Sequence, residues 1–489
     1  MIRITAILMT VFALVMATGV AYADGDITGI AVRYSVSTQK VRVVLDLPKE
    51  ATIVNQSTPT AVVVAVNIPL ANSLAPVTIT DPVVTGVTVT PDAKRQAVLT
   101  VSLAKPSKCT VFTLPAADGK PFRVVVDVLK LFTKEERQTL SPAIQYLRIE
   151  RQTEDHYTVA HLVEVNTSDP HVRVDAVAAQ GERERVAAMV ERTGAVCGVN
   201  GGFFLDSTRP VGLVKVDNQV RSMPIWGRTA VAFPGNGQPI LGNPAGVWRM
   251  TLPDGTTRDL PDWMDASILP QSPTAAVQSG ATFAQTPANP GGVTAIIRDG
   301  KVVARPTDAT PLTPGDVAIR LRGDEAKALD GVLVVGAAVT MTPVLTPAWT
   351  EYIGAVGAGP RLLRDGEVEI TADAERIPGD IRNGRAARTA LGLTADGRML
   401  LLVAEAPKPF DTGMTLEEIA NLLKAHGALQ AINLDGGGSS NLAIGATTVN
   451  YPPNTWIRPV ADGILVFDDR VKPTPPTTAP ASEVTTAKR

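Results

Sequence analysis

The feature that most constrains the fold of this 489-residue chain is a unit of helix, glycine, buried strand and glycine-rich corner that occurs twice. In the first copy, residues 183–193 place apolar residues at helical spacing and stop at Gly194. The apolar run 195–199 follows and ends in a corner of sequence Asn200-Gly201-Gly202. Glycines after a polar residue let the backbone turn sharply and approach a ligand closely.

The second copy repeats this order toward the C-terminus. Thr415 and Glu418 predict a capping box for a helix that ends at Gly427. The apolar run 428–434 then leads into Asp435-Gly436-Gly437-Gly438-Ser439. This copy therefore predicts a carboxylate, where the first predicts an amide, at the end of a buried strand.

Both polar residues are expected to face one site. In sheets covered by helices, ligand crevices lie at strand ends, so we expect Asn200 and Asp435 to look into one cleft. The alternative is that the glycines serve only tight turns. Because the same corner occurs twice, the sequence favours the site.

A hairpin adds two charged residues. The apolar runs 391–394 and 398–403 flank Asp396-Gly397, a signal for a two-residue hairpin turn. Without a bulge, this turn places Arg388 opposite Glu405. The two side chains would then share one end of the sheet, either within a site or as a rim salt bridge of little energetic worth.

The N-terminal part predicts a separate small domain. From residue 24 to 130 the chain consists of short β-branched runs separated by proline and glycine, which predicts an antiparallel β-sandwich. A sequence echo between two of the runs, 41–47 and 97–103, indicates related half-sheets. Residues 131–143 are charged and predict a short helical linker. The runs are 41–47, 60–67, 83–89, 97–103 and 122–128.

The two ends predict segments outside the folded domains. Arg3, an apolar run and the small residues Ala21-Tyr22-Ala23 predict a cleaved signal peptide over residues 1–23, and hence export to the periplasm or cell envelope. A membrane anchor is the alternative, but a spanning helix needs about 20 apolar residues, more than this run supplies. No later run is long and apolar enough to span a bilayer, so we expect no transmembrane segment in the mature protein. Residues 469–489 are rich in Pro and Thr and predict a disordered tail.

Charge and cysteine content exclude some functions. The formal net charge is -2 and 19% of residues are charged, which gives no electrostatic case for nucleic acid as a partner. The two cysteines, Cys109 and Cys197, lack metal-type spacing and predict buried free thiols, although a disulfide is permitted.

Five segments, in order and spacing, resemble the phosphodiester glycosidase family over roughly residues 145–467. This family includes the lysosomal uncovering enzyme, which removes N-acetylglucosamine from phosphodiester-linked mannose. The N-terminal runs resemble an AMIN domain, which implies peptidoglycan or septal targeting in a bacterial envelope. The five segments are Asn200 to Phe204, Gly357 to Leu363, Arg388 to Gly392, Gly413 to Leu416 and Asn433 to Ser440.

The resemblance implies a hydrolase that cleaves an N-acetylglucosamine-like sugar from a phosphodiester-linked glycan in the cell envelope. We expect Asp435 to act as nucleophile or base and Arg388 to bind the phosphate bidentately. Glu405 would be the second carboxylate or would orient Arg388. Asn200 would hydrogen-bond a sugar hydroxyl. Further substrate contacts are expected from Gly201, Gly202, Gly436, Gly437, Gly438, Ser439 and Arg361.

The chain departs from the family pattern at two places. Ala387 stands where family members often have proline, and Glu405-Ala406-Pro407 where they often have aspartate-glycine-arginine. The second departure removes an arginine. The chain therefore either uses another cation for phosphate, such as Arg361, Arg364 or Arg385, or acts on a different linkage.

Other readings of the second corner are weaker. Asp435 at a glycine corner suits Ca²⁺ or Mg²⁺, but no ligand-spaced partners support a metal, so we expect no cofactor. A serine hydrolase is disfavoured because neither Ser439 nor Ser440 lies in a GxSxG elbow. The alternative from another class is a non-catalytic envelope protein whose glycosidase-like domain binds glycan or peptidoglycan without turnover.

The predicted fold class is α+β, with a small antiparallel β-sandwich before a larger mixed α/β domain. The expected boundaries are a signal peptide at 1–23, an AMIN-like β domain at 24–130, a linker at 131–143, a glycosidase domain at 144–468 and a tail at 469–489.

Overall fold

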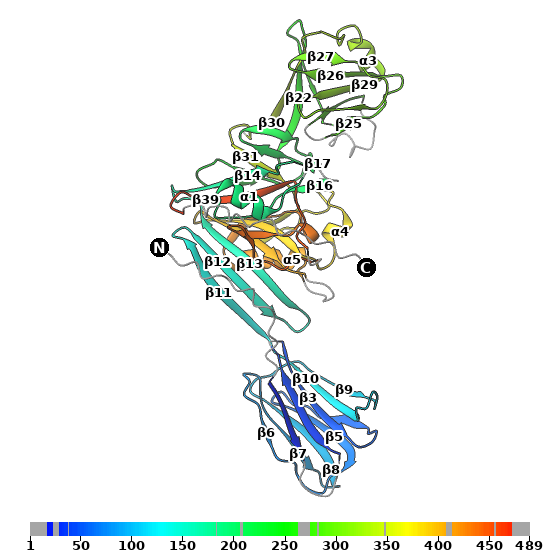
Figure 1. Ribbon diagram of the computed structural model, residues 1–489, viewed down its shortest axis with the longest axis vertical. Coiled ribbons are helices and arrows are strands. Elements are labelled where there is room, and N and C mark those ends of the chain that lie inside the picture. The colour runs from blue at the N-terminus through cyan, green and yellow to red at the C-terminus, as the bar shows by residue number, and fades with distance from the viewer. Residues whose placement is uncertain are drawn as a thin grey trace, which may run out of the picture. The chain divides into compact units, whose positions relative to one another are not determined.

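The computed structural model confirms the α+β class, with many strands and few helices (Figure 1). It divides into two compact units, Met1–Lys134 with Glu150–Tyr157, and Glu135–Ile149 with Thr158–Arg489. Among the described residues, no helix is long and apolar enough to cross a membrane. The structure describes residues 17–22, 29–37, 39–181, 183–205, 209–262, 274–280, 283–346, 349–406, 413–453 and 456–471.

The first unit is the expected antiparallel sandwich of two five-stranded sheets. Alternate residues of the central strands point inward and form one apolar core between the sheets. The two runs that echo each other in sequence are β3 and β8, and each is the middle strand of its sheet. One sheet runs β1 (Ala17–Tyr22), β2 (Ala31–Val36), β3 (Lys40–Leu47), β10 (Phe122–Leu129), β9 (Cys109–Leu114); the other runs β4 (Ile53–Asn55), β5 (Ala61–Pro69), β8 (Gln96–Leu103), β7 (Val84–Pro91), β6 (Val77–Thr78).

Two predicted segments border the sandwich, the helical linker and the signal peptide. The expected helical linker is wrong, because residues Phe132–Ser141 form strand β11, at the edge of a sheet. Pairing with the neighbouring strand outweighs the local preference of the charged residues, which an exposed edge strand tolerates well. Of the predicted signal peptide, Ala17–Tyr22 are described, as β1 paired with β2. The remainder of that segment and residues 472–489 of the predicted tail lie outside the described residues.

The second unit is built on two sheets that pack face to face. The first has eight strands and the second has five, and the described pairs of neighbouring strands within them are antiparallel. The eight-stranded sheet runs β11, β12 (Ile144–Gln152), β13 (Tyr157–Asn166), β35 (Arg398–Ala404), β34 (Arg388–Thr394), β36 (Ala428–Asn433), β32 (Arg361–Arg364), β33 (Glu367–Val368); the five-stranded sheet runs β14 (Val172–Ala178), β39 (Asp462–Asp468), β15 (Cys197–Asn200), β37 (Leu442–Ile444), β38 (Thr447–Thr448).

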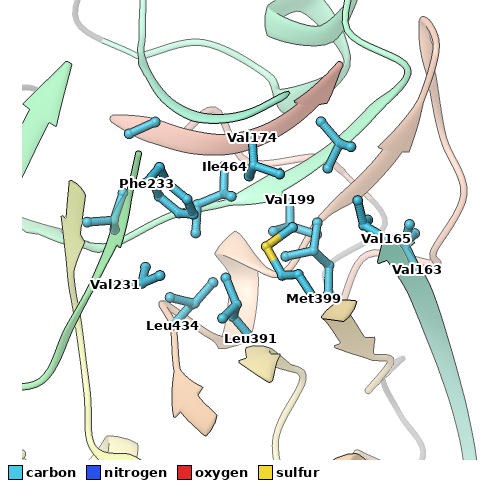
Figure 2. Packing of buried hydrophobic residues seen from close by; sticks show 14 of the residues in the cluster. Val163, Val165, Val174, Val199, Val231, Phe233, Leu391, Met399, Leu434 and Ile464 are labelled. Carbon is cyan, nitrogen blue, oxygen red and sulfur yellow. The ribbon is translucent and has the colours of Figure 1, made fainter. Parts of the chain in front are cut away.

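A single apolar core fills the space between these sheets. Figure 2 shows Val163, Leu391 and Met399 from the larger sheet against Val199 and Ile464 from the smaller one. Helix α5 (Leu416–Ala425) covers the outer face of the larger sheet, and helix α1 (Val186–Thr193) covers that of the smaller sheet. The order of layers is therefore helix, sheet, sheet, helix.

A third sheet connects this core to an inserted lobe. It runs β19 (Gln219–Ser222), β18 (Val214–Val216), β31 (Gly354–Gly357), β20 (Ala230–Phe233), β21 (Ile240–Gly242). Between β21 and β31 the chain forms the lobe, which begins with β22 (Ala245–Thr251) and ends with β30 (Thr340–Thr346). These two strands pair along their full length, with Ala245 opposite Thr346.

The lobe has its own antiparallel sheets, and its apolar core continues into the third sheet at residues such as Ala230 and Ala355. Its other elements are β23 (Thr257–Leu260), β24 (Ala275–Ser279), β25 (Gln285–Thr286), β26 (Val293–Arg298), β27 (Lys301–Ala304), β28 (Thr310–Pro311), β29 (Val317–Leu321) and α3 (Gly323–Leu329); outside the lobe, β16 (Phe203–Leu205) pairs with β17 (Arg209–Val211), and α4 (Gly379–Arg382) precedes β34.

Candidate active site

The two glycine-rich corners lie against each other. Each unit has the predicted order: α1 ends at a left-handed Gly194 before β15, and α5 carries the predicted Thr415–Glu418 capping box before β36. The Asn200 amide Nδ2 donates to the Asp435 carbonyl at 2.7 Å, and the Asp435 N–H donates to the Gly201 carbonyl at 3.0 Å. β15 and β36 belong to the two different sheets that pack face to face. The corners meet because these two strands end next to each other.

Asn200 is not positioned to bind a sugar, which corrects the expected role. Its side chain is completely buried. Its Oδ1 accepts from the Thr389 hydroxyl at 2.8 Å and from the Asn441 N–H at 3.1 Å. Because its amide also holds the Asp435 carbonyl, Asn200 fixes the second corner from behind.

Asp435 is the partly exposed carboxylate of the pair of corners. Burial of the carboxyl group raises its pKa to about 6, against the opposing effects of a hydrogen bond from Ser439, the charge of Arg458 and the Gly436 N–H. Ser439 is fully buried, and it is Asp435 that it contacts. Ser439 therefore orients the carboxylate instead of binding substrate as predicted.

A second carboxylate, Asp462, lies behind Asp435 and was not predicted. It begins β39 and is buried; its Oδ1 accepts the Gly202 N–H at 2.8 Å. Burial is the main cause that raises its pKa to about 7, and the nearby Asp435 charge raises it further. Within the described part of the chain, no hydrogen-bond partner reaches its Oδ2.

The glycines of the first corner make room for this carboxylate. A Cβ on Gly201 would overlap Asp462 Oδ1, and a Cβ on Gly202 would lie 2.6 Å from the Gly357 carbonyl. Only glycine allows such close approach. The predicted role of both residues in binding substrate is thus replaced by one in holding Asp462.

Arg458 supplies the cation of the site and was also missed. Its Nη1 lies 3.5 Å from Ser439 Oγ, and a Cβ on Gly438 would lie 2.8 Å from its Cζ, so the guanidinium rests on the glycine turn. In the described residues no carboxylate lies within ion-pair distance of this partly exposed group. Ser439 is thus placed between a carboxylate and a guanidinium that retains donors for an anion.

The other glycine N–H groups are mostly in use. The Gly437 N–H donates to the Ala387 carbonyl at 2.7 Å, and Gly436 N–H bonds the Asp435 carboxylate. Gly437–Ser439 form a single 3-10 turn, η1. Of the three expected backbone donors, Gly438 is the one for which the described contacts leave the N–H available.

Arg388 is not a phosphate clamp. It is buried, and its guanidinium donates to three backbone carbonyls: Met414 at 3.1 Å, Ile381 at 2.7 Å and Gly384 at 3.0 Å. Burial lowers its pKa. Its donors tie β34 to the segments on either side of it, and all three guanidinium nitrogens already donate within the protein, which does not fit the predicted bidentate contact with a phosphate.

Glu405 does not face Arg388 either, because the hairpin register differs by one residue from the prediction. Arg388 pairs with Ala404, since the turn holds three residues and ends with Gly397 at a φ of 83°. A slip of one residue sends a side chain to the opposite face of the sheet. The expected pairing of Arg388 with Glu405 is therefore wrong.

Glu405 instead belongs to a buried relay. Its Oε1 lies 2.7 Å from His161 Nε2 and 2.7 Å from the Tyr451 N–H, and the Tyr146 hydroxyl lies 2.8 Å from His161 Nδ1. Burial raises the pKa of Tyr146 to about 12, so the phenol keeps its proton and donates to Nδ1. His161 then donates from Nε2 to Glu405, which holds the Tyr451 backbone.

The three other candidate cations are occupied elsewhere. Arg361 is buried and lies opposite Ile432 in the sheet. Its Nη1 donates to Gln430 Oε1 at 2.6 Å, and Gln430 and Asp435 lie on opposite sides of Ile432 along the chain. Arg364 pairs with Glu369. Arg385 bonds Glu418 at 2.7 Å and the Gly413 carbonyl at 2.6 Å. None of them replaces the missing family arginine, whereas Arg458 is available.

A sequence signal for the missed residues existed. Asp462-Gly463 repeats the pattern of an acidic residue and a glycine beside an apolar run, here 464–467. Asp462 reaches the corner because Asn200 pairs with Gly463, more than 250 residues farther along the chain. Local sequence patterns do not reveal such a distant pairing. In the described part of the chain no group of three or more His, Cys, Asp or Glu side chains has the arrangement of a metal site.

Part of the chain is similar to known proteins. Residues 271–467 match the model of the phosphodiester glycosidase family. The mouse enzyme N-acetylglucosamine-1-phosphodiester alpha-N-acetylglucosaminidase is 29% identical over 160 residues, which cover 29% of this chain and 30% of that protein. The human enzyme of the same name is 34% identical over 94 residues, 18% of each chain. The chain thus spans less than a third of the length of these relatives.

Two solved structures have a similar fold. A hypothetical protein from Synechocystis has a TM-score of 0.59 at 22% identity, covering 92% of this chain and 81% of that one. A protein from Burkholderia pseudomallei has a TM-score of 0.53 at 17% identity, covering 86% of this chain and 96% of that one. At these identities the likeness concerns the fold alone.

Proposed function

We propose, from the match of residues 271–467 to the phosphodiester glycosidase family, that this chain hydrolyses a glycosyl phosphodiester and releases an N-acetylglucosamine-like sugar. The observation that carries the proposal is the Asp435–Ser439–Arg458 arrangement. It sets a carboxylate and an anion-binding guanidinium on one glycine turn.

The arrangement suits the chemistry of this bond. As the C1–O bond breaks, the departing phosphate gains a second negative charge, and water supplies a hydroxyl to C1 and a proton to the solution. A guanidinium binds the dianion more strongly than the monoanionic diester, so Arg458 stabilises the transition state more than the ground state. Asp435 acts as nucleophile or as base toward water.

Asp462 has a supporting role in this proposal. With a pKa near 7 it is largely protonated where Asp435, with a pKa near 6, is ionised. Neighbouring carboxylates with separated pKa values are typical of acid–base sites. A neutral Asp462 leaves the local charge favourable for a phosphate beside Arg458.

The cellular setting of the proposal is the bacterial envelope. The leader-like residues 1–23 and the β-sandwich that resembles an AMIN domain support export and attachment near peptidoglycan. Pull-down of the purified first unit with isolated peptidoglycan sacculi tests the attachment, and absence of retention contradicts it.

The proposal is tested by comparing two substrates that share one sugar. N-acetylglucosamine joined to an aryl phosphate and N-acetylglucosamine joined directly to the aryl group are each incubated with the full chain. We expect turnover of the diester only, and about a hundredfold loss of kcat/KM in Arg458→Ala. Arg364→Ala, which removes an exposed arginine paired with Glu369, serves as the control.

Two outcomes contradict the proposal. Equal turnover of both substrates would show that phosphate recognition plays no part. Sugar binding without turnover of any diester would favour the glycan-binding alternative.

A further inference from the structure

Two exposed aromatic residues, Tyr451 and Trp456, lie close in the chain to Asn450 and Arg458, which contact the corner that holds Asp435. Tyr451 is 49% exposed and Trp456 is 53% exposed. Single exposed apolar residues are ordinary on protein surfaces, whereas aromatic residues gathered at a polar site indicate binding. Within the described residues of the second unit, Trp226 is the other strongly exposed aromatic residue, and it belongs to a separate turn before β20.

Tyr451 is fixed at one end of the corner. The preceding residue, Asn450, donates from Nδ2 to the Ser440 carbonyl at 3.1 Å and accepts the Leu442 N–H at 2.7 Å. The Tyr451 N–H itself donates to Glu405 at 2.7 Å. The backbone that carries this ring is therefore held in place, so the exposed ring loses little entropy on binding a ligand.

Trp456 lies close in the chain to the residue that contacts the other end of the corner. It stands two residues before Arg458, whose guanidinium rests on Gly438 and approaches Ser439. Asn450 thus contacts the glycine turn at Ser440, and Arg458 contacts it at Gly438. Tyr451 and Trp456 are one and two residues away from these contacts in the chain.

The position of the rings indicates which part of a substrate they contact. The scissile sugar has to reach Asp435, which is only partly exposed, with the buried Asp462 behind it. Rings that are about half exposed lie farther toward solvent and contact what extends beyond that sugar. Pyranose rings present a face of C–H groups that packs against an aromatic ring while their hydroxyls remain hydrated.

We infer that Tyr451 and Trp456 form a stacking subsite for a second pyranose ring, so that the substrate is an oligosaccharide or polysaccharide instead of a single sugar on a phosphate. This inference rests on the proposed function for the identity of the central site. Glu405, His161 and Tyr146 act as positioning residues, because their relay holds the Tyr451 backbone.

The test measures binding without hydrolysis. Isothermal titration calorimetry of the full chain compares N-acetylglucosamine, glucose and mannose with chitotriose, maltotriose and mannotriose, none of which contains a phosphodiester. We expect one trisaccharide to bind about tenfold more tightly than its monosaccharide, and Trp456→Ala and Tyr451→Ala each to remove most of that tenfold difference. Trp226→Ala is the matched control and should change neither affinity.

The outcomes separate the inference from the proposed function. Trisaccharide binding that both variants retain, or the lack of any trisaccharide preference, overturns the inference. A preference that the variants lose, in a protein that hydrolyses no phosphodiester, supports the subsite and overturns the proposed function. Both aromatic side chains are exposed, so unchanged thermal unfolding of the variants should confirm that their fold is intact.

Discussion

The two glycine-rich corners have the same local sequence pattern and opposite uses. At the first corner the polar side chain, Asn200, is completely buried and every contact that it makes is within the protein. At the second corner Asp435 is partly exposed and has a raised pKa beside an unpaired guanidinium in the described chain. The first corner holds the backbone of the second corner, and the second corner carries a carboxylate that solvent can reach. A repeated pattern therefore predicts a shared geometry, and burial decides which copy carries the chemistry.

The largest expected effect is on the second corner. Asp435→Asn removes the reactive carboxylate and should lower kcat by about a thousandfold, or ~4 kcal/mol of transition-state stabilisation. The free energy of unfolding at pH 7.5 should not fall, because the amide keeps the shape of the side chain and removes a charge that is partly desolvated in the folded protein. Initial rates and urea unfolding measure the two quantities. Retained turnover would show that this corner is structural as well.

The effect of Asp462→Asn on the free energy of unfolding should depend on pH. A carboxyl pKa that folding raises contributes stability that is fully present below the unfolded pKa, near 4, and is lost as pH rises through the folded pKa, about 7. Asp462→Asn should therefore be more stable than the parent above pH 7, by up to about 4 kcal/mol, with no advantage below pH 4. Urea unfolding at several pH values measures this difference.

The same substitution should change the activity profile. In the parent, kcat/KM should rise as Asp435 ionises near pH 6 and fall as Asp462 ionises near pH 7, with both apparent values belonging to the pair. Asp462→Asn should flatten the alkaline side. A variant that keeps the parent's alkaline fall would assign that fall to another group.

Asn200→Ala should lower the free energy of unfolding by about 2–3 kcal/mol, since it leaves the Asp435 carbonyl, the Thr389 hydroxyl and the Asn441 N–H without their partner. Chemical denaturation measures the loss. Asn236→Ala, at an exposed turn, is the control and should stay within about 0.5 kcal/mol. A stable Asn200→Ala protein with weakened sugar binding would restore the original expectation for this residue.

The smallest expected effect compares two neighbouring glycines. In Gly438→Ala the new methyl group displaces the Arg458 guanidinium, so the inhibition constant for inorganic phosphate should rise by about tenfold. Gly437 has open space around it but a φ of 57°, so Gly437→Ala should cost about 1 kcal/mol of stability and leave phosphate binding unchanged. Equal effects of the two variants would contradict the placement of Arg458.

Local patterns in the sequence were sufficient to predict much of the fold. The capping box at Thr415, the glycine stop after α1 and the β-branched runs of the sandwich all act over a few residues, and each element is found where it was expected. The linker failed because its exposed charged residues gain more from pairing at a sheet edge than from a helix of their own.

The site was only partly predictable, because it depends on the length of one turn and on contacts between segments that are distant in sequence. The hairpin turn after β34 holds one residue more than the shortest form, a small local difference that moves Glu405 to the other face. The role of Arg388 depends on three carbonyls that its own sequence neighbourhood does not identify. Asp462 and Arg458 reach the corner through contacts between distant segments.

The inserted lobe has a consequence for how such proteins diversify. Its first and last residues, Ala245 and Thr346, are partners across one antiparallel ribbon, so the chain leaves and returns at points about 5 Å apart. A short turn could close that gap. The lobe therefore enters and leaves the third sheet through a single ribbon, so a change in its length need not alter how the strands that carry the two corners are connected.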